Sequence, residues 1–152
     1  MAVNRRVLEA HLEAETILVI EDEPLIRMTL NDELSSAGFH VLDAGNASEA
    51  MAILEAGLDV GCVVSDVIVH GEMNGLALAW KIRRRWPRLA VVLSTGKALP
   101  SPTMVPERTS LLHKPYGLDD LVAVVTAAIG GGPGIGGGPR GDIAWLVSED
   151  VT

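Results

Sequence analysis

Cysteine and long apolar runs are scarce in this chain of 152 residues. Its one cysteine, Cys62, excludes an internal disulfide and is typical of a protein kept in a reducing compartment. Every apolar run is far shorter than the roughly 20 residues that cross a bilayer. The N-terminal region, with Arg5, Arg6, Glu9 and Glu13, lacks the apolar core of a signal peptide. These absences predict a cytoplasmic protein that has no membrane segment.

Positive charge and aromatic side chains are also in short supply. The net charge of −8 leaves no sequence-wide positive field to meet phosphates, which argues against nucleic acid as a direct partner. The basic run from Lys81 to Arg88 is a local exception. Aromatics make up only 3% of a chain that is 48% hydrophobic, so we expect one globular domain with an aliphatic core.

Five short apolar runs alternate with segments of helical periodicity. The runs cover residues 16–20, 39–44, 61–66, 89–93 and 110–113. Continuous apolar runs of this length are typical of strands buried on both faces of a parallel sheet. The repeated strand–helix alternation therefore predicts an α/β fold with a doubly wound, five-stranded parallel sheet and right-handed crossovers.

Two regions depart from this regular pattern. Pro100, Pro102 and Pro106 interrupt the segment 97–109, so we expect the fourth helix to be irregular or missing. After Ile129 a Gly- and Pro-rich stretch leads to an apolar segment around Trp145. We therefore divide the chain into a lead-in of helical character at 1–15, a domain at 16–129, and a linker with a C-terminal tail at 130–152.

Charged and hydroxyl side chains follow four of the predicted strands. They are Glu21 and Asp22 after the first, Asp66 at the end of the third, Thr95 and Gly96 after the fourth, and Lys114 after the fifth. Open α/β sheets bind ligands at the carboxyl ends of their strands. Carboxylates brought together from separate strands suit Mg²⁺, and an added lysine and hydroxyl suit a tetrahedral dianion. The set favours phosphoryl transfer to a carboxylate.

In this order, the motifs give the chain a specific resemblance to a known family. From Ile17 to Val125 it resembles the receiver domain of two-component response regulators, which are CheY-like and flavodoxin-like in fold. The resemblance implies strand order 2-1-3-4-5 and phosphorylation of Asp66 by a sensor histidine kinase or a histidine phosphotransfer protein. It implies Mg²⁺ bound by Asp22, Asp66 and the backbone carbonyl of Ile68, with Glu21 acting through water. Thr95 would be the switch hydroxyl, Gly96 would offer its N–H to the phosphate, and Lys114 would pair with it. A cis peptide is expected before Pro115.

Several positions depart from the family pattern. His70 stands where receivers usually have proline, and Leu111 stands where many have Tyr or Phe. The positions that tune phosphate lifetime in the family are Ile68 and Lys97 here. We expect an altered output face and, because apolar Ile68 would hinder water, a long-lived phosphorylated form.

The sequence therefore predicts a stand-alone response regulator. Its output would be a protein contact, phosphate relay or self-association, the last through the tail. We expect a phosphoacceptor that catalyses its own phosphorylation and dephosphorylation, and no enzyme with a separate substrate. One alternative is an Mg²⁺-dependent phosphatase of the haloacid-dehalogenase type, although Pro24 stands where that family has its second Asp. The other is a pseudo-receiver that only binds partners.

Overall fold

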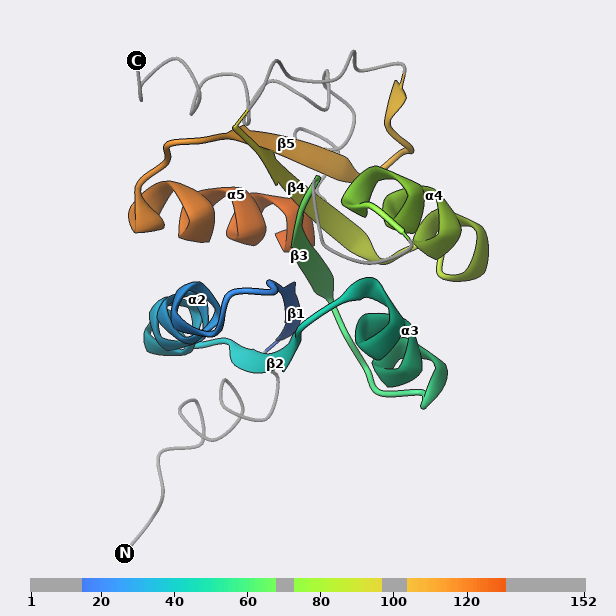
Figure 1. Cartoon of the computed structure of the whole chain (residues 1–152), viewed down its shortest axis with the longest axis horizontal. Coiled ribbons are helices and arrows are strands. Elements are labelled where there is room, and N and C mark those ends of the chain that lie inside the picture. The colour runs from blue at the N-terminus through green and yellow to red at the C-terminus, as the bar shows by residue number, and fades with distance from the viewer. Residues whose placement is uncertain (1–14, 68–72, 97–103, 131–152) are drawn as a thin grey trace, which may run out of the picture.

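The computed structural model describes residues 15–67, 73–96 and 104–130 (Figure 1). The predicted lead-in helix, most of the linker, and the tail lie outside these residues. The elements are β1 Thr16–Ile20, α2 Pro24–Ser36, β2 His40–Ala44, α3 Ala47–Glu55, β3 Cys62–Asp66, α4 Gly75–Arg85, β4 Ala90–Thr95, β5 Thr109–His113 and α5 Leu118–Gly130. The five strands and the helices that follow four of them were predicted from the sequence.

The strands form one parallel sheet in the order β2-β1-β3-β4-β5, which confirms the predicted fold class. β1 pairs with both β2 and β3, and Asp66 at the end of β3 stands opposite Ser94 of β4. Thr95 of β4 in turn stands opposite His113 of β5. This register brings the carboxyl ends of the strands to a common edge.

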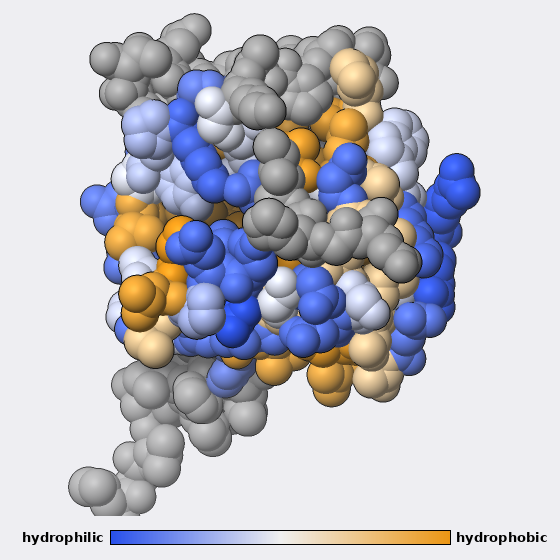
Figure 2. Space-filling model, viewed as in Figure 1, coloured by the Kyte–Doolittle hydropathy of each residue, from blue (hydrophilic) through white to orange (hydrophobic). Residues whose placement is uncertain are grey.

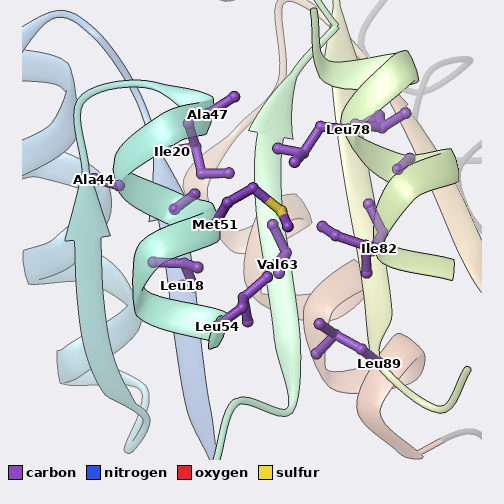
Figure 3. Close-up of a cluster of buried hydrophobic side chains, with 14 of the residues drawn as sticks. Leu18, Ile20, Ala44, Ala47, Met51, Leu54, Val63, Leu78, Ile82 and Leu89 are labelled. Carbon is purple, nitrogen blue, oxygen red and sulfur yellow. The ribbon is translucent and has the colours of Figure 1, made fainter. Parts of the chain in front are cut away.

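Helices cover both faces of the sheet, so the inner strands β1, β3 and β4 are buried on both sides. On one face α3 and α4 pack against apolar side chains of all five strands (Figure 3). Figure 3 shows the side chain of Met51 reaching from α3 toward Val63 of β3, with Leu78 and Ile82 of α4 beyond it. On the other face Leu30 and Leu34 of α2 pack with α5. The core is aliphatic, as the composition predicts.

The helix ends follow local sequence signals. Pro24 occupies the first turn of α2, and Gly38 takes a φ of +101° just beyond that helix. Asn46 and Asn74 cap α3 and α4, each accepting a bond of 2.8 Å at its side-chain oxygen from a backbone N–H. Leu25, near the start of α2, is apolar but 76% exposed.

The connection between β4 and β5 is irregular in the part that the structure describes. Residues 104–108 contain no α-helix, in agreement with the proline-based prediction. The guanidinium of Arg83 on α4 donates to the carbonyls of Glu107 and Arg108 at 2.6 and 3.3 Å. The indole N–H of Trp80 donates to the carbonyl of Met104 at 3.0 Å. Side chains of α4 thus fix this connection to the body of the domain.

Within the ranges given above, no helix has the length and apolar character needed to cross a membrane. The outer flank of the molecule over α4 is strongly hydrophilic (Figure 2). Arg84 and Arg85 are exposed there, so the basic run predicted from the sequence is largely a solvated helix face.

Candidate functional site

The predicted site residues within the described part of the chain meet at the carboxyl edge of the sheet. Glu21 and Asp22 directly follow β1, and Asp66 ends β3. Thr95 ends β4, and its carbonyl accepts a bond of 2.7 Å from the N–H of Lys114. A side chain added at Gly96 would lie 4.0 Å from Cβ of Lys114, so this glycine also borders the site.

Asp66 and Lys114 form the central contact of this edge. Nζ of Lys114 lies 2.5 Å from Oδ2 of Asp66, and the two side chains are 40% and 20% exposed. Partial burial alone would lower the pKa of Lys114, but the hydrogen bond and the charge of Asp66 outweigh it and raise the pKa. The lysine therefore carries a firmly held positive charge beside a carboxylate that solvent can still reach.

Glu21 and Asp22 are close enough to influence each other. Burial raises the pKa of Glu21, and its contact with Asp22 raises it further. The N–H of Glu23, which donates to Oε1 of Glu21 at 3.1 Å, and the charge of Lys114 act in the opposite direction. The net upward shift in the pKa of Glu21 comes chiefly from burial, so its ionised carboxylate is a costly charge at this edge.

The donor chemistry of the edge fits a hard divalent cation. Carboxylate oxygens are the ligands that Mg²⁺ prefers, and a cation would relieve the repulsion between Glu21 and Asp22. Among the described residues, no three Asp, Glu, His or Cys side chains could together hold an ion. The predicted set instead completes two carboxylates with a backbone carbonyl and water, and it stays a prediction. That carbonyl belongs to Ile68, which lies outside the described residues, as do His70 and Lys97.

Two neighbours of the site did not emerge from the sequence. The phenol of Tyr116 is hydrogen-bonded to Ser94, and its pKa is raised by burial and by the charges of Asp66 and Glu21, although Lys114 and the Ser94 bond oppose this. Arg27 on α2 donates to the carbonyl of Glu21 at 2.7 Å. A tyrosine after Lys-Pro and an arginine on a polar helix face carry no distinctive signal, so only the folded arrangement reveals them.

Backbone geometry also shapes the edge. The peptide between Lys114 and Pro115 is cis, as expected from the resemblance. A Cβ at Gly75 would fall well within contact distance of the carbonyl oxygen of Asp66, so this glycine allows α4 to begin directly against the end of β3. Its N–H donates to the carbonyl of Val67 at 2.8 Å.

Comparison with known proteins agrees with this arrangement. The response regulator receiver domain family matches residues 17–126. The transcriptional regulatory protein FixJ of Bradyrhizobium diazoefficiens is 35% identical over 118 residues, which cover 74% of this chain and 56% of that protein. The sensor kinase CckA of Brucella abortus is 33% identical over 118 residues, covering 72% of this chain and 12% of the kinase. The chain thus spans only part of these longer relatives.

Solved structures give the same result. The crystal structure of a response regulator receiver protein from Sinorhizobium medicae superimposes with a TM-score of 0.73 at 27% identity, covering 78% of this chain and 97% of that one. Together with the match over 17–126, this shows that the chain belongs to the response regulator receiver domain family of two-component signalling.

Proposed function

We propose that Asp66 accepts a phosphoryl group from a phosphohistidine on a sensor histidine kinase or a histidine phosphotransfer protein. The observation that carries this proposal is the contact of 2.5 Å between Nζ of Lys114 and Oδ2 of Asp66. It supplies an accessible carboxylate nucleophile together with a fixed positive charge where negative charge would develop. Family membership supports the same role.

In the proposed reaction, a carboxylate oxygen of Asp66 attacks the phosphorus atom. A P–O bond forms, the P–N bond breaks, and its electron pair returns to the imidazole nitrogen of the donor. Lys114 then pairs with a phosphoryl oxygen, which offsets charge without a proton transfer. Thr95 and Gly96, at the end of the neighbouring strand, would donate hydrogen bonds to the same group.

Receiver domains are generally Mg²⁺-dependent, and Asp22 and Asp66 are the carboxylates that would bind the ion here, with Glu21 acting through water. When bound, Mg²⁺ neutralises charge on the phosphoryl oxygens. The protein's own contribution is to hold these acids together at one edge of the sheet.

We propose output through contact with another protein or through phosphate relay, in a cytoplasmic setting without nucleic acid. Stand-alone action, dimerisation and a long-lived phosphorylated form stay predictions from the sequence, since the relatives are longer and Ile68 and the tail lie outside the described residues.

Intact-mass spectrometry after incubation with acetyl phosphate and Mg²⁺ tests the proposal. The wild type should gain the mass of one phosphoryl group, and Asp66→Asn should gain none. Asp59→Asn is a matched control, because Asp59 is exposed and precedes β3 at the opposite edge of the sheet. A wild type that gains no mass from either acetyl phosphate or a phosphorylated histidine donor would favour the pseudo-receiver alternative.

A further inference from the structure

A groove of about 410 Å³ lies at the edge of the sheet opposite Asp66. It is formed where α3 and α4 end and where β3 and β4 begin. Leu54, Leu58, Trp86 and Leu89 provide its apolar lining. Figure 3 shows Leu54 and Leu89 at the same end of the buried cluster, so the groove is continuous with the core beneath it.

Two arginines line the groove, and they differ in whether the side chain already has an ion-pair partner. Arg85 is already paired with Glu55, Nη1 to Oε2 at 3.0 Å, and its guanidinium lies 4.6 Å from the ring centre of Trp86. Arg88, also lining the groove, is exposed and has no ion pair or hydrogen bond from its side chain within the part of the chain that the structure describes. Asp59 is the one acid among the lining residues. The groove therefore offers an apolar surface beside a cation that can take an acidic partner.

The C-terminal tail has the complementary chemistry. Residues 143–150 read Ile-Ala-Trp-Leu-Val-Ser-Glu-Asp, which places an apolar group around Trp145 one residue before two acids. A tryptophan side chain buries a large area when it enters an apolar recess. The two acids follow closely enough to reach the rim of a groove that holds Trp145.

The path of the chain brings the tail to this edge. Since α5 follows the carboxyl end of β5 and runs back along the sheet, it ends at Gly130 on the edge where the groove lies. α5 and the groove are on opposite faces, so a connection must pass around the end of the sheet. A Gly-rich linker such as residues 131–142 spans roughly 20 Å on average. This is enough to pass layers that are each about 10 Å thick.

We propose that residues 143–150 dock into this groove of their own chain, with Trp145 against Leu58 and Trp86 and the following acids beside Arg88. Docking would cover the ends of α3 and α4. It is independent of the phosphoryl chemistry at Asp66.

Paramagnetic relaxation in the full-length ¹⁵N-labelled protein tests this docking. A nitroxide attached at Ser148→Cys gives a single labelled position, because Cys62 is fully buried and burial raises the pKa of its thiol to about 12. Docking predicts selective loss of amide signal at residues 58–61 and at Trp86, Arg88 and Leu89, relative to the reduced label. Adding Trp145→Ala to the labelled chain should restore these signals.

A matched pair of surface variants separates docking in the groove from nonspecific contact. Leu58→Glu places a charge in the groove at a side chain that is 51% exposed, and should restore the signals as Trp145→Ala does. Met28→Glu changes a similarly exposed side chain on α2 and should leave the signal loss intact. The proposal is overturned if the loss is uniform, survives Trp145→Ala or Leu58→Glu, or falls on the edge strands β2 or β5. Loss only between chains in a mixture of ¹⁵N-labelled and nitroxide-labelled protein would also overturn it, because it would assign the groove to the tail of a second copy.

Discussion

At the scale of single residues, the carboxylates of the acidic edge differ in how much their ionised forms destabilise the fold. Lys114 stabilises Asp66 directly, whereas Glu21 is buried against Asp22 and has a raised pKa. A carboxyl whose pKa is higher in the folded than in the unfolded chain destabilises the fold when it is ionised. This cost is present at neutral pH and disappears as the pH falls through the raised pKa.

Glu21→Gln should therefore increase stability at pH 7 in the absence of divalent cations. The amide removes the buried charge, and its oxygen can still accept from the N–H of Glu23. Each kcal/mol gained should raise Tm by roughly 2–4 °C in a domain of this size. Thermal denaturation of both proteins between pH 7 and pH 4 should show the difference shrinking as the pH falls.

A control for this experiment is Glu33→Gln, which changes an acid in the last turn of α2. We expect it to have little effect. A Glu21→Gln variant that is less stable than the wild type at pH 7, or equally stable at every pH, would contradict a raised pKa at Glu21.

At the scale of elements, the link between β4 and β5 depends on α4. Arg83 donates to the carbonyls of Trp86 and Pro87 at 3.2 and 2.9 Å, in addition to those of Glu107 and Arg108. One guanidinium thus satisfies the end of its own helix and fixes the residues before β5. Arg108 has a φ of 58°, a conformation that favours glycine. The set of hydrogen bonds from Arg83, which we call the Arg83 clamp, helps to hold Arg108 in this conformation.

We expect Arg83→Ala to destabilise the domain by about 1–3 kcal/mol, because several carbonyls lose their donor at once. Arg84→Ala is the matched control: Arg84 is exposed and makes no hydrogen bond or ion pair within the described residues. Urea denaturation followed by far-UV circular dichroism measures both. Equal midpoints for the two variants would show that the clamp contributes nothing to stability.

At the scale of the whole molecule, the sequence predicts the sheet and the place where its strands deliver reactive side chains. Continuous apolar runs mark buried strands, and parallel pairing sends all their carboxyl ends to one edge. The position of Asp66 beside Lys114 follows from that rule and from the family resemblance. These predictions work because they depend on local periodicity and on topology.

Other features depend on contacts between residues far apart in the chain, which periodicity does not report. Arg83 meets Glu107 and Arg108 across 24 and 25 residues, and Tyr116 meets Ser94 of the neighbouring strand. In each case tertiary packing, and not the local pattern, decides the environment.

The most direct test of the central claim is chemical trapping of the acceptor. After phosphorylation by acetyl phosphate with Mg²⁺, borohydride reduces an aspartyl phosphate to homoserine, and peptide mass spectrometry locates the changed residue. We predict homoserine at position 66, and unreduced Asp at 22 and 59. Homoserine at another position, or a phosphorylated protein in which Asp66 remains unchanged, would contradict the assignment of Asp66 as the phosphoacceptor.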